Sequence, residues 1–95
     1  MAVGDYNTIQ GCQNTAIGNV NTVTGNENEV IGSCNTVTGS GNDAYGNYIN
    51  TYGNNNTAVG NTITQVGEDN LAAGNTIGQY GEGNTALGDC ITQYG

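Results

Sequence analysis

The stretch that decides the fold is GNVNTVTGNENEVIGSCNTVTG, residues 18–39. It contains one seven-residue unit three times, and each unit ends on glycine with an asparagine and a valine at fixed places before it. The spacing continues in both directions, because glycine recurs every seven residues from Gly4 to Gly95 without an insertion. The chain therefore comprises thirteen copies of x-x-(Asn/Ile)-Thr-(Val/Ala/Gln)-x-Gly after four residues. Such strict periodicity predicts a repeat architecture.

The chemistry of the unit favours a strand over a helix. Glycine at every seventh residue would cost a helix about 1 kcal/mol each time, which argues against a coiled coil. The most restricted residues occupy positions 3 and 5 of the unit, and this two-residue period is that of a strand. Glycine at position 7 suits a corner with positive φ. Each unit is therefore predicted to form one short strand and one turn.

A single short strand buries nothing, so the units are expected to form pairs. Two units make a 14-residue coil whose strands face each other, and successive coils stack through backbone hydrogen bonds. We call the wall formed by units 1, 3, 5 and onward the odd wall, and the other the even wall. The predicted fold class is all-β, a two-walled parallel β-solenoid of about six and a half coils that forms a single domain, residues 1–95. Its length is expected to be roughly 31 Å.

The inward positions 3 and 5 change character along the chain. Even units keep asparagine followed by a small apolar residue, whereas odd units change from an Asn/Val type in residues 5–46 to an Ile/Gln type in residues 47–95. Buried amides are costly unless they are hydrogen-bonded, and equivalent amides one coil apart satisfy each other as ladders. The predicted inward ladder comprises Asn14, Asn28, Asn42, Asn56, Asn70, Asn84, Gln65, Gln79 and Gln93.

Two outward features predict self-association. Position 6 of the even wall carries a nearly continuous apolar stripe, which is typical of a lateral contact surface. The predicted assembly stripe is Ile17, Ile31, Tyr45, Val59 and Leu87. The repeat also continues in register to Gly95 without a capping helix, a proline or a lysine. Uncapped solenoid ends favour head-to-tail stacking that does not close into a ring.

The charge restricts the partners. The net charge is −8, and lysine, arginine and histidine are all missing. Nucleic acid is therefore not expected as a partner, because no side chain would neutralise phosphates. Membrane insertion is not expected either, since no apolar run approaches the roughly 20 residues that a spanning helix needs. The start, MAVGDYNTIQG, lacks signal-peptide features, and the composition favours a mature exported chain located outside the cell or at its surface.

Few residues suggest chemistry. Without a histidine or lysine base and without a nucleophile next to a base, no enzymatic activity and no cofactor are expected. Glu68, Asp69 and Glu82 would be the best divalent-ion ligands, but the glycine-rich calcium motif of β-rolls is missing, so no metal is predicted. An internal disulfide is not expected, since the nearest cysteines in one column lie about four coils, or 19 Å, apart. Intermolecular disulfides are the alternative for the three cysteines, which are Cys12, Cys34 and Cys90.

Several motifs resemble known families of repetitive β proteins. QVGEDNLA (65–72), QYGEGNTA (79–86) and TYGNNNTA (51–58) resemble curlin repeats of amyloid fibre subunits. That resemblance implies inward ladders at Gln65, Asn70, Gln79 and Asn84. NTAIGNVNTVTG (14–25) resembles the β-roll heads of trimeric autotransporter adhesins, and NTVTGSGN (35–42) resembles the ice-binding β-rolls of grasses.

Three functions follow as expectations. The leading one is a structural subunit that assembles with copies of itself, end to end, into an extracellular amyloid-like fibre or matrix. The first alternative is an ice-binding β-roll, whose partner would be an ice surface and whose outward face would comprise Thr22, Thr24, Thr36 and Thr38. The second alternative is a fragment of an adhesin head that forms trimers through the assembly stripe.

Overall fold

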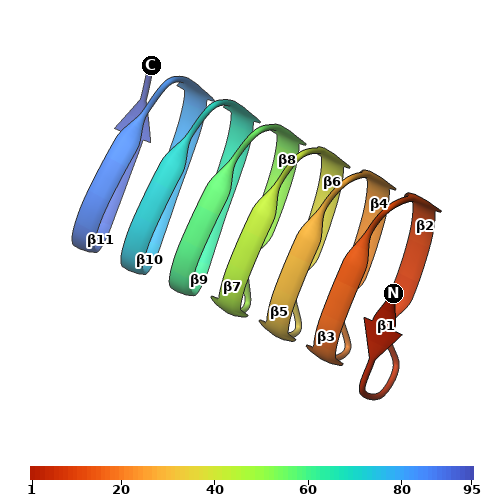
Figure 1. Cartoon of the computed structure of the whole chain (residues 1–95). Coiled ribbons are helices and arrows are strands. Elements are labelled where there is room, and N and C mark those ends of the chain that lie inside the picture. Colours follow the sequence, from red (N-terminus) through yellow and green to blue (C-terminus); the bar gives the residue numbers. More distant parts are fainter.

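The protein is an all-β solenoid of stacked parallel strands, as predicted (Figure 1). The computed structural model describes residues 1–95 and contains no helix. Its strands are β1 (Ala2–Val3), β2 (Thr8–Cys12), β3 (Thr15–Asn19), β4 (Thr22–Asn26), β5 (Glu29–Ser33), β6 (Thr36–Ser40), β7 (Asp43–Asn47), β8 (Asn50–Asn54), β9 (Thr57–Glu68), β10 (Leu71–Glu82) and β11 (Thr85–Tyr94).

The register confirms the 14-residue coil. Every strand pairing is parallel and joins a residue to the one fourteen positions later, as in Val23 with Val37 and Ala44 with Ala58. Strands β1, β3, β5 and β7 form the even wall, and β2, β4, β6 and β8 form the odd wall. The longer β9, β10 and β11 turn a corner and contribute to both walls. The chain measures 32 × 20 × 11 Å, so its longest dimension agrees with the expected rod.

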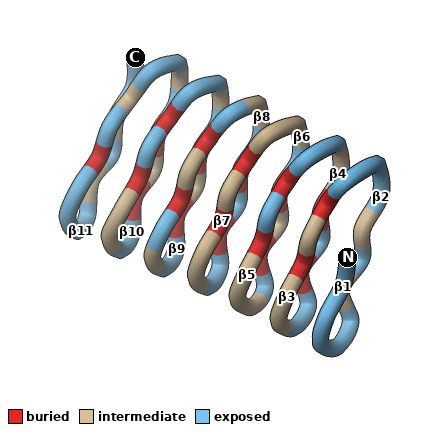
Figure 2. The backbone as a smooth tube through the Cα atoms, in the orientation of Figure 1, coloured by how far each residue is buried: buried red, intermediate tan, exposed pale blue.

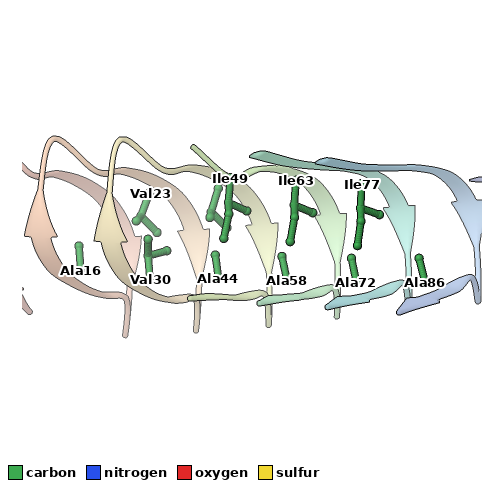
Figure 3. Packing of buried hydrophobic residues seen from close by; sticks show 11 residues of the cluster. Ala16, Val23, Val30, Ala44, Ile49, Ala58, Ile63, Ala72, Ile77 and Ala86 are labelled. Atoms are coloured by element: carbon green, nitrogen blue, oxygen red, sulfur yellow. The ribbon is translucent and has the colours of Figure 1, made fainter. Parts of the chain in front are cut away.

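The core is a thin row of side chains between the walls. Figure 2 shows the buried residues as short red bands on every coil except the one formed by β1 and β2. Large aliphatic side chains come mainly from the odd wall and small ones from the even wall, as Figure 3 shows for Ile63 and Ile77 opposite Ala58 and Ala72. This division keeps the local volume filled without overpacking, because a large residue mostly meets a small one; Val30, opposite Val23, is the exception.

The glycines at position 7 are required for two reasons. Those from Gly4 to Gly88 have φ between 112° and 137°, a backbone conformation that residues with a Cβ atom rarely adopt. A Cβ atom would also collide with the coil above: at Gly46 it would lie 1.7 Å from the carbonyl oxygen of Gly60. The predicted positive φ is confirmed, and the close stacking of the corner backbones adds a second constraint.

A second left-handed residue, which the sequence analysis missed, lies at position 2 of every unit. The non-glycine residues there have φ between 54° and 60°, and they include the β-branched Val20, Thr62 and Thr76. This conformation costs an L-residue about 1–2 kcal/mol. The corner offsets the cost with backbone hydrogen bonds between coils, as from the Val20 N–H to the Asp5 carbonyl at 2.9 Å. Position 2 varies in residue type, so no residue preference marks it.

Candidate assembly surfaces

The asparagine ladder is present and buried, and it bonds chiefly to the backbone. Asn42 illustrates the pattern: its Oδ1 accepts from the N–H of Asn56 at 2.9 Å, and its Nδ2 donates to the Gly53 carbonyl at 2.8 Å. Its own N–H donates to Oδ1 of Asn28 at 2.9 Å. Only one Asn–Asn amide pair in the core bonds directly, from Nδ2 of Asn28 to Oδ1 of Asn14 at 3.2 Å. Each asparagine thus ties three successive coils together.

The glutamine ladder uses a different pattern. Nε2 of Gln65 donates to Oε1 of Gln79 at 2.9 Å, and Nε2 of Gln79 donates to Oε1 of Gln93 at 2.8 Å. The remaining amide hydrogens of Gln65 and Gln79 reach the carbonyls of Thr57 and Leu71 at 3.0 Å across the core. These glutamines therefore bond to one another along the rod and also link the two walls.

Most of the predicted ladder lies in the interior. Asn14, Asn28, Asn42, Asn56, Asn70, Gln65 and Gln79 are buried, whereas Asn84 and Gln93 are half-buried because they belong to the last coil. Asn21 and Asn35 of the odd wall also belong to the ladder, and their place at position 3 was the signal for them. A second, exposed row at position 1 was missed. It includes Asn61 and Asn75, whose amides bond at 3.0 Å.

The two ladder types meet imperfectly where the sub-blocks join. Thr51 and Gln65 are register partners on the odd wall, and both are fully buried. Oγ1 of Thr51 and Oε1 of Gln65 have no hydrogen-bond partner. Buried polar atoms without partners cost about 1–3 kcal/mol each, so this junction is a weak point of the core.

The predicted assembly stripe forms one column along the even wall. Its members lie in register, and exposure rises along the rod from the half-buried Ile17 to Leu87, which is 67% exposed. Carboxylates accompany the stripe, because Glu29 and Asp43 are neighbouring register partners on the same wall. The hydroxyl of Tyr45 donates to Oε1 of Glu29 at 2.8 Å. The stripe therefore lies beside a negatively charged site, as the place of both carboxylates at position 4 of successive even units predicts.

Burial and charge perturb two groups at this site. Partial burial, followed by the nearby Glu29 carboxylate, raises the pKa of Asp43 above its usual 3.8. Burial, the hydrogen bond to Glu29 and the adjacent carboxylates raise the pKa of Tyr45 to about 12. Both shifts show that negative charge is unfavourable on this part of the even wall.

The odd wall has two outward faces in succession. In its first half, Thr22 and Thr24 pair in register with Thr36 and Thr38, so the proposed ice-binding residues form a regular two-by-two array. The second half is aromatic and aliphatic. Its position 6 residues are Tyr52, Val66, Tyr80 and Tyr94.

The end coils have open edges in this chain. Strands β2 and β11 each pair with one strand only, namely β4 and β10. The core residues Ile9 and Ile91, which belong to these end coils, are only partly buried.

The remaining candidate sites are the cysteines and the corner carboxylates. All three cysteines are free and exposed, so intermolecular bridging of Cys12, Cys34 and Cys90 stays a prediction. No group of three or more metal-ligating side chains comes together, and Glu68, Asp69 and Glu82 form no such cluster. The structure has no pocket. It also lacks any helix of the length and apolarity that a membrane span requires.

Sequence comparison adds no relative. The chain matches no protein-family model, and no curated protein matches it. The structure establishes the solenoid fold. Because no relative was found, the resemblances to curlin repeats, adhesin heads and grass ice-binding β-rolls stay predictions.

Proposed function

We propose that this chain is a structural subunit that stacks end to end into an extracellular fibre or matrix. The observation that carries the proposal is the uniform 14-residue register, because every coil presents the same backbone hydrogen-bonding pattern and a coil of a second copy would continue it. A parallel sheet edge is a template for another strand, and nothing on β2 or β11 blocks it with a lysine or a proline.

The hydrogen bonds inside the rod indicate how a further coil would attach. The N–H groups of Thr8, Thr22 and Thr36 each donate to a carbonyl thirteen residues later, at 2.7–2.8 Å. Thr92 occupies the equivalent position in the last coil of the chain. A second copy stacked on β11 would supply the acceptor, since its strands have the same spacing. Ile91 would be covered by the same contact.

Charge opposes the association. Each copy carries −8 and no cationic side chain, so two copies repel each other at neutral pH. Added salt screens this repulsion, and acidification toward the isoelectric point of 4.1 removes it. Fibre growth is therefore expected to increase with salt and with falling pH. Loss of the filaments on addition of a reductant would assign the exposed cysteines to cross-linking between copies.

Electron microscopy and fibre diffraction of concentrated protein test the proposal. The native chain is expected to form long filaments with an axial reflection at about 4.7–4.8 Å. Thr92→Pro removes the edge N–H, and proline is tolerated on an edge strand, so this variant should stay particulate while Thr92→Ala still forms filaments. Discrete native particles of the length of one rod, or filaments of the proline variant, would contradict end-to-end stacking.

Ice binding is the second candidate, because the threonine array supports it. Thr22, Thr24, Thr36 and Thr38 lie outward in register on a flat wall. An ice-growth assay on monomeric protein tests this function, and Thr36→Tyr is expected to abolish any activity. The adhesin-head alternative predicts instead a stable trimer that Ile31→Asp disperses.

A further inference from the structure

The eight carboxylates avoid one face of the rod. Glu29 and Asp43 lie on the even wall, and the other six lie at the corners, at positions 1 and 2 of their units: Asp5, Glu27, Glu68, Asp69, Glu82 and Asp89. The outward positions 4 and 6 of the odd wall carry no charge in any unit. The odd wall is therefore a neutral face on a strongly acidic rod.

This distribution matters for contacts between copies. The chain has no cationic side chain, so a carboxylate that enters a contact with a second copy finds no opposite side-chain charge there. Pairing through the even wall would bring the Glu29 and Asp43 sites of two copies toward one another. Pairing through the odd wall keeps all sixteen carboxylates of two copies out of the centre of the contact.

The second half of the odd wall also has a self-complementary shape. Its position 6 column is tall and 38–77% exposed, and comprises Tyr52, Val66, Tyr80 and Tyr94. The rings of Tyr80 and Tyr94 stack with centroids 5.1 Å apart and planes 10° from parallel. Beside it runs a lower column at position 4, which comprises Asn50, Thr64, Gly78 and Thr92. We call the column of large side chains the ridge and the neighbouring column of smaller side chains the groove.

We propose that two copies of this chain pair side by side through their odd walls, with the rods parallel. A two-fold axis along the rods places the ridge of each copy on the groove of the other and keeps equivalent coils at the same height. Tyr80 of one copy then lies over Gly78 of the other, where the only side chain near the Cβ position is the Tyr80 ring of that same copy, at 3.8 Å.

A specific dimer would use nearly the whole odd wall. A wall of 32 × 20 Å covers about 640 Å² per copy, or about 1,280 Å² for the pair. Specific interfaces bury about 1,200–2,000 Å² in total. Tyrosine is enriched at the centres of such interfaces, and charged residues are depleted there, as on this wall.

Mass per unit length separates this pairing from end-to-end stacking. One rod has 9.7 kDa over 32 Å, which is about 0.3 kDa per Å, and stacking leaves that value unchanged. Side-by-side pairing doubles it to about 0.6 kDa per Å. The proposal does not require filaments, because a pair of single rods gives the same doubling.

Three variants locate the contact face. Tyr80→Glu places a charge on the ridge, and Gly78→Gln fills the groove without adding charge. A Cβ at Gly78 would meet only Cε2 of Tyr80, at an ordinary 3.8 Å, so the folded rod accepts the larger residue. Leu87→Glu is the matched control, since it adds the same charge at position 6 of the even wall, on a residue that is 67% exposed.

The experiment is small-angle X-ray scattering at moderate salt, with circular dichroism to verify the fold. We expect about 0.6 kDa per Å for the native chain and for Leu87→Glu, and half that value for Tyr80→Glu and Gly78→Gln. If one odd-wall variant fails to fold, the other decides. A native value near 0.3 kDa per Å would overturn the proposal. Loss of pairing only in Leu87→Glu would overturn it in favour of the even-wall assembly stripe.

Discussion

The N-terminal and C-terminal halves of the rod have the same backbone and different interiors. In residues 5–46 the odd wall places asparagine and then valine inside, whereas in most of residues 47–95 it places isoleucine and then glutamine inside. Each odd unit except the one with Ile49 and Thr51 thus contributes one amide and one aliphatic side chain, and the order of the two is opposite in the two halves. The asparagines bond to the backbone of neighbouring coils, while the glutamines bond to one another.

The comparison indicates what the fold requires of its interior. Asparagine at position 3 lies close enough to the corner to reach the glycine carbonyl of the next coil. Glutamine at position 5 lies farther from the corner, and its longer side chain reaches the next glutamine and the opposite wall instead. The order of amide and aliphatic residue is therefore exchangeable, provided that every buried amide finds partners. Where the order changes, two buried oxygen atoms have no hydrogen-bond partner, namely Oγ1 of Thr51 and Oε1 of Gln65.

Both halves share the corner glycines, and replacing one gives the largest expected effect. Gly46→Ala places a Cβ 1.7 Å from the Gly60 carbonyl oxygen, so we expect a loss of more than about 4 kcal/mol in the free energy of unfolding. Gly78→Ala is the matched control on the wall, where the space is open, and it should be neutral or stabilise by about 0.5 kcal/mol. Denaturant unfolding followed by circular dichroism measures both. Similar losses of unfolding free energy in Gly46→Ala and Gly78→Ala would show that the corner glycines do not control the stacking of the coils.

The ladders of the two halves are expected to differ in strength. Asn35→Ala leaves two main-chain groups without partners, the Ile49 N–H and the Gly46 carbonyl, and should cost about 3 kcal/mol. Gln79→Leu should cost about 1 kcal/mol, because Gln65 keeps its bond to the Thr57 carbonyl and Gln93 is half-buried. Unfolding free energies of the two variants provide the test. An equal or greater loss for the glutamine would contradict the proposed distinction.

The junction between the halves should be improvable. Thr51→Val removes a buried hydroxyl without a partner and continues the valine column of the first half, so we expect a gain of about 1 kcal/mol. Thr64→Val, one coil later and outward, is the control and should change stability by less than about 0.5 kcal/mol. The melting temperatures of the two variants give the answer. A destabilised Thr51→Val protein would mean that the hydroxyl is satisfied in solution.

The smallest expected effect concerns the stacked carboxylates that only the first half carries on its even wall. The pKa of Asp43 is higher in the folded than in the unfolded chain, so protonation of its carboxyl stabilises the folded state. This stabilisation is complete below the unfolded pKa of 3.8 and is lost as the pH rises through the folded-state pKa. Acidification from pH 7 toward 4.1 should therefore raise the melting temperature. Asp43→Asn should raise the melting temperature at pH 7 and reduce the dependence of the melting temperature on pH. The control Asp5→Asn should have a smaller effect on both. A melting temperature that falls on acidification would contradict the expected direction of this effect.

Much of the fold was accessible from periodicity alone. The seven-residue glycine spacing predicted the strand, the turn and the 14-residue coil, and the restricted positions 3 and 5 predicted which side chains lie inside. The left-handed residue at position 2 was inaccessible, since residues as different as Val20, Glu27 and Thr62 adopt it. The corner geometry and its inter-coil hydrogen bonds impose this conformation, so no residue preference marks it. The self-assembly, ice-binding and localisation hypotheses stay predictions.

The sequence by itself determined the number of residues per coil, the two walls and the inward row of amides, because hydrophobic and polar patterns of fixed period leave only one way to stack. Only the tertiary structure decided which groups those amides bond to, since that depends on the distance from each side chain to the neighbouring coil. It also decided where hydrogen bonding is incomplete between the two sub-blocks, at the buried oxygen atoms of Thr51 and Gln65. These are contacts between residues fourteen positions apart, and their geometry is set by the stacked backbone.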